Sequence, residues 1–141
     1  MNGLDAIIDT NVFVSARNPH ERGYAAARRI LERIDRGEFR AAISTVTISE
    51  LRAGFRPEEV PTVWKPLLRH LLTSVNYRVE SVGPEIAEKA GELRTSSRLT
   101  LPDCLIIATG HQLGVRVLLT QDKELARHQS LLDVRSPLEL S

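Results

Sequence analysis

The stretch Ala6-Ile7-Ile8-Asp9-Thr10-Asn11 decides the fold, because a short apolar run ends there on an acid followed by two polar residues. Residues 4–8 have the length and composition of a buried strand. Working outward, strands are predicted at residues 40–44, 77–82, 115–120 and 131–134. Helical patterns alternate with them, at residues 21–36, 46–55, 62–74, 84–98 and 103–113. This alternation predicts an α/β fold with a mostly parallel five-stranded sheet between two helical layers, since parallel strands need crossover helices.

Length and composition describe one domain spanning residues 1–141. The formal net charge is only +1, so overall charge does not indicate nucleic-acid binding. The single cysteine, Cys104, can form no internal disulfide and no cysteine-based zinc site. No run is long and apolar enough to cross a membrane. A cytoplasmic protein without a membrane partner is therefore expected.

Three acids come just after predicted strands, and a fourth opens a predicted helix. Asp9 follows residues 4–8, Glu50 lies soon after residues 40–44, and Asp122 follows residues 115–120. Asp103 begins the helix at residues 103–113. Parallel α/β sheets bind ligands outside the carboxyl ends of their strands. The four carboxylates are therefore expected to gather at one edge of the sheet.

Each of these acids also has a purely structural explanation. Asp9, Asp103 and Asp122 stand where a helix can begin, and aspartate there commonly accepts a hydrogen bond from a free backbone N–H. Thr47 and Glu50 have the spacing of a capping box. Taken singly, each acid is therefore explained by helix capping.

Taken together, the four acids favour a metal site. Carboxylates crowded at one edge repel one another unless cations neutralise them, and oxygen ligands of this kind suit Mg²⁺ or Mn²⁺. Such an ion can activate water and stabilise charge developing at phosphorus, so phosphodiester hydrolysis is the predicted reaction. Thr10, Asn11 and Thr120 supply neutral hydrogen-bonding groups beside the acids.

With these motifs in place, the chain resembles PIN-domain ribonucleases, and especially the VapC-type toxins of toxin–antitoxin pairs. The resemblance rests on the order and spacing of four motifs rather than on any one of them. These are Ile8-Asp9-Thr10-Asn11-Val12-Phe13, Ile48-Ser49-Glu50-Leu51, Asp103-Cys104-Leu105-Ile106-Ile107-Ala108 and Leu119-Thr120-Gln121-Asp122. The motifs span nearly the whole chain, and a compact PIN domain, a three-layer α/β/α sandwich, is about this size.

The resemblance implies a metal-dependent endoribonuclease in which Mg²⁺, or Mn²⁺ in its place, is held by an acidic quartet. That quartet is Asp9, Glu50, Asp103 and Asp122. Asn11 and Thr120 match supporting polar residues of the family. The chain departs from the family where Leu125 follows Glu124, in place of a frequent phenylalanine, and Glu124 is expected on a solvated helix face.

The resemblance also implies an RNA substrate, a homodimer and a small cognate antitoxin. An antitoxin helix has a candidate contact surface on residues 46–55 and 62–74, although apolar spacing of this kind is more often plain core. The second segment carries Val63, Trp64, Leu67, Leu68, Leu71 and Leu72. Candidate contacts for RNA phosphates, otherwise simply solvated charges, are Arg17, Arg52, Arg56 and Arg98.

Other functions stay open at this level. A phosphorylated receiver domain is also a small five-stranded α/β unit around Mg²⁺, but here Asp9 stands without an acidic neighbour and no lysine follows residues 131–134. A PIN-like nuclease acting outside a toxin–antitoxin pair is a further alternative. A PIN-like binding module without activity is disfavoured, because all four acids are present.

Overall fold

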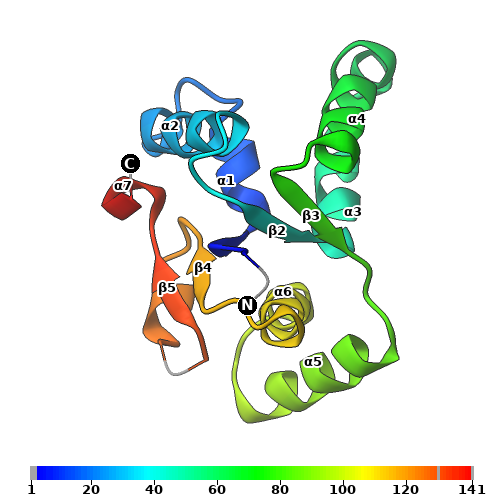
Figure 1. The fold of residues 1–141 in the computed structure, drawn as a ribbon. Coiled ribbons are helices and arrows are strands. Elements are labelled where there is room, and N and C mark those ends of the chain that lie inside the picture. Colours follow the sequence, from blue (N-terminus) through cyan, green and yellow to red (C-terminus); the bar gives the residue numbers. More distant parts are fainter. Residues whose placement is uncertain (1–2, 130, 141) are drawn as a thin grey trace.

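The computed structural model describes residues 3–129 and 131–140. Within this part of the chain one five-stranded sheet forms in the order β3-β2-β1-β4-β5, and every pair of neighbours is parallel (Figure 1). The strands are β1 (Ala6–Ile8), β2 (Ala41–Ser44), β3 (Tyr77–Glu80), β4 (Val117–Leu119) and β5 (Asp133–Arg135). The predicted α/β class and parallel sheet are confirmed.

Helices cover both faces of this sheet, with α1, α2 and α4 on one side and α5 and α6 on the other (Figure 1). The helices are α1 (Thr10–Ser15), α2 (Tyr24–Asp35), α3 (Thr45–Ala53), α4 (Lys65–Thr73), α5 (Pro84–Ser96), α6 (Leu101–Leu113) and α7 (Pro137–Leu140). Shorter turns are η1 (Pro57–Glu59), η2 (Val60–Trp64) and η3 (Leu125–Arg127). No helix among the residues described is long and apolar enough to span a membrane.

Two apolar cores lie on the two faces of the sheet, because successive strand residues point to opposite faces. Ile8 and Ile43 belong to the core beneath α1, α2 and α4. Ile7, Ala42 and Leu118 belong to the core beneath α5 and α6. Strands buried on both faces read as continuous apolar runs, which is why short runs in the sequence located them.

The strand order determines where a site can form. From β1 the chain adds β2 and β3 on one side and β4 and β5 on the other, so the order reverses between β1 and β4. A crevice at such a reversal is the usual ligand position in parallel sheets. The order also differs from the 2-1-3-4-5 order of flavodoxin-like receiver domains, so the receiver alternative is wrong.

Several predicted bounds need correction. The helix expected at 62–74 is divided into η2 and α4, because Pro66 has no N–H to donate within the helix and its ring clashes with the preceding turn. The strand expected at 131–134 begins two residues later, at Asp133. Two short helices, α1 and α7, were not expected from the sequence. The others differ from their predictions by a few residues at the ends, where assignments are least certain.

Candidate active site

Asp9 lies directly after β1, at the edge of the sheet where the strand order reverses between β1 and β4. Its backbone N–H donates to the carbonyl of Leu119 at 2.9 Å, which ties it to the neighbouring strand. It holds the N-cap position of α1, but its side chain makes no capping hydrogen bond. Instead its Oδ2 accepts from Thr120 Oγ1 at 2.7 Å and from Asn11 Nδ2 at 3.1 Å. The capping explanation therefore does not account for this carboxylate.

The environment of Asp9 favours the protonated form. Burial raises its pKa to about 6, and the charges of Asp103 and Glu50 add to the rise, while the hydrogen bond from Thr120 opposes it. Only 5% of Asp9 is exposed, so water does little to stabilise its charge. A cation beside this carboxylate would restore the ionised form.

Glu50 lies on α3, where the sequence left a capping role open. The structure assigns the cap to Ser44, whose hydroxyl accepts from the backbone N–H of Val46 at 3.1 Å. Glu50 is therefore not part of a capping box. Its Oε1 accepts from Thr10 Oγ1 at 2.6 Å, and the rest of this exposed side chain faces solvent.

Asp103 lies in the first turn of α6 and not at its N-cap, which is Thr100. The Thr100 hydroxyl accepts from the backbone N–H of Asp103 at 3.4 Å. Partial burial raises the pKa of Asp103, and the charges of Asp122 and Glu50 raise it further, against the hydrogen bond with Thr100. Its carboxylate therefore interacts electrostatically with all three other members of the predicted quartet.

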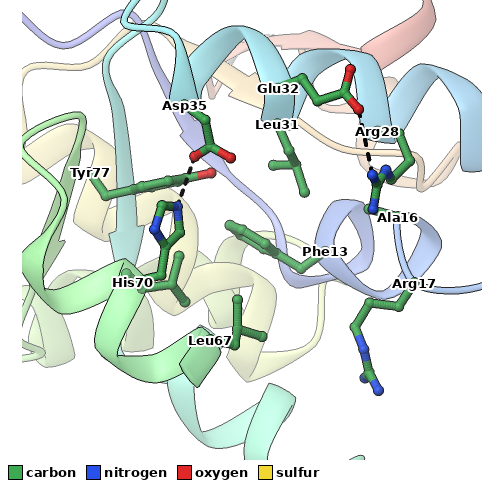
Figure 2. A pocket seen from close by; sticks show the side chains of 11 residues that line it. Phe13, Ala16, Arg17, Arg28, Leu31, Glu32, Asp35, Leu67, His70 and Tyr77 are labelled. Atoms are coloured by element: carbon green, nitrogen blue, oxygen red, sulfur yellow. Dashed lines mark hydrogen bonds and ion pairs between the residues drawn. The ribbon is translucent and has the colours of Figure 1, made fainter. Parts of the chain in front are cut away.

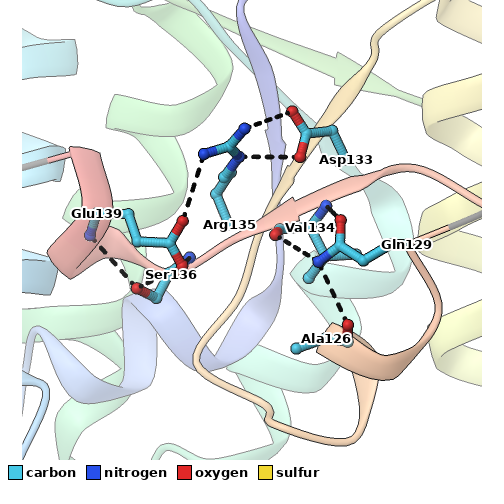
Figure 3. A network of polar contacts seen from close by, with 7 residues as sticks. All are labelled: Ala126, Gln129, Asp133, Val134, Arg135, Ser136 and Glu139. Atoms are coloured by element: carbon cyan, nitrogen blue, oxygen red, sulfur yellow. Dashed lines mark hydrogen bonds and ion pairs between the residues drawn. The ribbon is translucent and has the colours of Figure 1, made fainter.

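Asp122 lies in the loop after β4. Its backbone N–H donates to Thr120 Oγ1 at 3.0 Å, and its Oδ1 accepts from the backbone N–H of Glu124 at 2.8 Å. Gln129 closes this loop, since its carboxamide bonds both the N–H and the carbonyl of Val134 (Figure 3). One oxygen of Asp122 thus accepts a hydrogen bond within the turn, while the charge of this side chain still acts on Asp103.

The four acids interact electrostatically at one edge of the sheet, but they do not form a ready-made chelating site. In the stretches 3–129 and 131–140, no three His, Cys, Asp or Glu side chains meet in a geometry that could hold an ion directly. This does not conflict with their coupling, because charges act over longer distances than metal–oxygen bonds. Mg²⁺ usually keeps several waters and binds through one or two carboxylates. The donor chemistry therefore fits a hydrated Mg²⁺ or Mn²⁺ ion.

Neutral residues orient the carboxylates of Asp9 and Glu50. The sequence had assigned two of these neutral residues no role at the site. Asn11 and Thr120, the predicted supporting residues, both contact Asp9 through hydrogen bonds. Thr47, considered only as a cap, lies 3.0 Å from Thr10 Oγ1. Gln121, for which the sequence offered no preference, donates its backbone N–H to Asn11 Oδ1 at 3.0 Å. Their positions beside motif residues were the only indication in the sequence that they belong to the site.

The other charged candidates lie outside this cluster of acids or in pairs of their own. Glu124 is exposed and forms an ion pair with Arg127 at 3.2 Å. Arg17 lies over the ring of Phe55 at 3.8 Å and pairs weakly with Glu59. Arg56 pairs with Glu58 and Glu59, and both Arg52 and Arg98 are exposed.

A separate pocket of about 220 Å³ lies between α1, α2 and α4 (Figure 2). Phe13, Leu31 and Leu67 line its apolar part, and His70 and Asp35 lie 2.8 Å apart at its side. The predicted contact surface on 62–74 is mostly core, because Trp64 is buried against Phe55 with ring centres 5.4 Å apart. Val63 and Leu72 of that segment stay exposed.

These features place the chain among α/β proteins that carry a group of carboxylates at the carboxyl edge of a parallel sheet. The chain belongs to the PIN domain family, whose pattern it matches over residues 6–131. It is 33% identical over 108 residues to Ribonuclease VapC10 of Mycobacterium tuberculosis, covering 73% of this chain and 72% of that protein.

Solved structures share the fold. A toxin–antitoxin complex from Klebsiella pneumoniae aligns with a TM-score of 0.69 and 24% identity, covering 94% of this chain and 98% of that one. VapC20 of M. tuberculosis, described as a sarcin–ricin loop cleaving toxin, aligns with a TM-score of 0.69 at 15% identity over 93% and 99% of the two chains. VapBC2 from Rickettsia felis, bound to a promoter DNA fragment, aligns with a TM-score of 0.67 and 20% identity, covering 94% of this chain and 98% of that chain. The PIN-like architecture is thereby confirmed.

Proposed function

We propose that this chain is a divalent-metal-dependent endoribonuclease that hydrolyses RNA phosphodiesters as the toxin of a toxin–antitoxin pair. The observation that carries the proposal is the buried Asp9 carboxylate, whose pKa is raised by burial and further by the charges of Asp103 and Glu50 at the carboxyl edge of the sheet. Carboxylates whose pKa values are shifted by burial and by a specific charged neighbour are candidates for functional sites. The likeness to Ribonuclease VapC10 supports RNA as the substrate.

Asp9, Glu50, Asp103 and Asp122 are the residues that would hold the ion. When bound there, Mg²⁺ or Mn²⁺ supplies the charge that polarises a phosphodiester and lowers the pKa of water. Asp9 and Asp103 fit this role because burial raises their pKa values and the charges of neighbouring carboxylates raise them further, so a cation would favour the ionised forms of both. The carboxylate of Glu50, being exposed, also meets the solvent from which RNA arrives.

The remaining residues of the site orient its acids. Thr120 and Asn11 both direct hydrogen bonds at Oδ2 of Asp9 and so fix the orientation of that carboxylate. Thr10 holds one oxygen of Glu50 in the same manner. Fixed carboxylates lose little freedom when a ligand binds, so such contacts are expected to strengthen binding and catalysis.

The test is cleavage of a structured RNA pool by purified, antitoxin-free protein with Mn²⁺, Mg²⁺ or EDTA. Asp9→Asn serves as the matched control, because it keeps the side-chain shape and reveals contaminating nuclease. We expect cleavage with either ion and none with EDTA or in the variant. Cleavage by Asp9→Asn at the wild-type rate, or cleavage in EDTA, would refute the proposal. A DNA pool run in parallel tests the choice of sugar.

The proposed function also implies an antitoxin partner and a second copy of this chain. A cognate antitoxin is supported by the structural likeness to toxin–antitoxin complexes. The pocket between α1, α2 and α4 supplies an apolar surface with Arg17, Arg28 and Asp35 around it (Figure 2). We expect the chain to purify as a homodimer and to lose activity when it is co-expressed with a cognate small antitoxin. Light scattering and RNA cleavage by the co-purified complex check both points.

A further inference from the structure

Gln121 joins the candidate site to the loop between α1 and α2, residues 16–23. Its side-chain Oε1 accepts a hydrogen bond from the hydroxyl of Ser15, the last residue of α1. Its Nε2 donates to the carbonyl of Gly23, the N-cap of α2, at 3.0 Å. Both ends of the loop are therefore held by one carboxamide, which stands next to Asp122 in the sequence.

We propose that Gln121 is a positioning residue of the candidate site, which clamps the 16–23 loop against the turn after β4 and thereby fixes Asn11 and Asp9. This inference rests on the proposed function and names a residue that the acidic motifs do not include. Gln121 acts through its neighbours, so it is not itself a catalytic residue.

The path from Gln121 to Asp9 consists of hydrogen bonds alone. The backbone N–H of Gln121 donates to Asn11 Oδ1, which leaves the amide nitrogen of Asn11 free to donate elsewhere. That nitrogen donates to Asp9 Oδ2 at 3.1 Å and to Thr120 Oγ1 at 3.0 Å. A shift of the Gln121 backbone would therefore change the donors that orient Asp9.

Gly23 shows how closely Gln121 approaches the loop. A Cβ built on Gly23 would collide with the carboxamide of Gln121. The backbone of Gly23 has φ −87° and ψ 7°, and this negative φ does not itself demand glycine. A Cβ at position 23 would therefore displace the Gln121 carboxamide from its contacts with the loop. Gly83 is a useful contrast, because it is also a helix N-cap but has open space where a Cβ would lie.

These two positions allow a test by double substitution. Gln121→Ala removes the clamp, Gly23→Ala pushes it away, and the double variant has both the clamp and the collision removed. Gly83→Ala controls for the loss of glycine at an N-cap. The measurements are kcat and KM for RNA cleavage, Mn²⁺ affinity by calorimetry, and thermal unfolding to verify the fold.

We expect Gln121→Ala and Gly23→Ala to lower kcat about ten- to a hundred-fold with little change in KM. Mn²⁺ affinity should fall about ten-fold, as for residues that orient metal ligands. The double variant should be no worse than Gln121→Ala alone, and Gly83→Ala should match the wild type. If Gln121→Ala does not fold, Ser15→Ala removes one arm of the clamp and should change kcat and Mn²⁺ affinity in the same direction.

Wild-type kcat and Mn²⁺ affinity in folded Gln121→Ala would overturn the positioning role, as would additive losses in the double variant. A wild-type protein that binds Mn²⁺ but cleaves no RNA would refute the proposed function, and the Mn²⁺ affinities of the variants would still decide the role of Gln121. A wild-type protein that neither binds Mn²⁺ nor cleaves RNA would overturn both.

Discussion

The hydroxyl of Thr10 lies 2.6 Å from Oε1 of Glu50 and joins α1 to α3 across 40 residues of sequence. The same hydroxyl lies 3.0 Å from that of Thr47, which is fully buried. A hydroxyl has one proton and a carboxylate only accepts, so Thr10 donates to Glu50 and Thr47 donates to Thr10. This small network holds a predicted metal ligand in one orientation.

Replacing Thr10 by valine should therefore weaken both stability and activity. The isosteric Thr10→Val leaves the buried Thr47 hydroxyl without this partner, at a cost of about 1–2 kcal/mol in the free energy of unfolding. Cleavage should fall about ten-fold, because Glu50 loses its orienting donor. Urea unfolding and initial rates measure the two effects. The control is Thr62→Val, since Thr62 is exposed and its hydroxyl is 3.5 Å from the carbonyl of Glu58.

Asp9 should make the metal-free protein less stable as the pH rises. Its folded pKa is about 6, above the ordinary 3.8, so the folded state binds the extra proton between these values. The resulting stabilisation is complete below about pH 4 and is lost as the pH rises through 6. The loss is on the order of 3 kcal/mol, at 1.36 kcal/mol for each pKa unit.

Urea unfolding of wild type and Asp9→Asn in EDTA, from pH 4 to 8, measures this loss. The variant cannot ionise at position 9, so its stability relative to the wild type should grow across that range. A constant difference between the two proteins would show that Asp9 has an ordinary pKa.

We expect Asp122 and Glu124, which lie close together in the sequence, to differ sharply in their effect on RNA cleavage. Asp122→Asn keeps an oxygen to accept from the backbone N–H of Glu124 but removes the charge that acts on Asp103. RNA cleavage should fall by about two orders of magnitude or more, as when an electrostatic contributor to catalysis is removed. Glu124→Gln is the matched control, and its rate should be unchanged, because Glu124 is exposed and paired with Arg127. Equal losses in the two variants would contradict this assignment.

Divalent ions should raise the melting temperature. An ion bound only by the folded protein stabilises it by about 2.7 kcal/mol when present at about 100 times its dissociation constant. It also offsets the burial, and the repulsion between carboxylates, that raise the pKa values of Asp9 and Asp103. Thermal unfolding with Mn²⁺, and again after EDTA, measures the effect. Asp103→Asn should show a smaller shift, and an equal shift in that variant would place the ion elsewhere.

Much of the layout could be predicted because it depends on local pattern. Apolar runs such as Ile7 and Ile8 located strands buried on both faces, and Gly114, with φ 68°, ends α6 where the sequence indicated a stop. The alternation of strands and helices then required parallel pairing. The prediction of a single helix at 62–74 was wrong, and its cause is also local, because Pro66 divides that segment into η2 and α4.

The sequence named candidate residues for the site, whose roles stay a prediction, but it could not give their contacts. The polar residues that follow strands were visible in sequence, so Asp9, Asn11 and Thr120 could be placed at one edge of the sheet. Whether Asp103 caps a helix or acts on other acids could not be decided, because both roles have the same local signature. The structure separates them by giving the cap to Thr100.

The amino-acid sequence by itself determined the class of fold, the parallel sheet and the polar residues that directly follow its strands, such as Asp9 and Thr120, because periodicity and strand ends are local properties. Only the tertiary structure decided that β1 lies between β2 and β4, that Thr10 meets Glu50, and that Gln121 reaches Gly23. The last contact joins residues 98 positions apart. Such pairs depend on strand order and on how helices pack across the sheet, and a local pattern of residues carries no record of either.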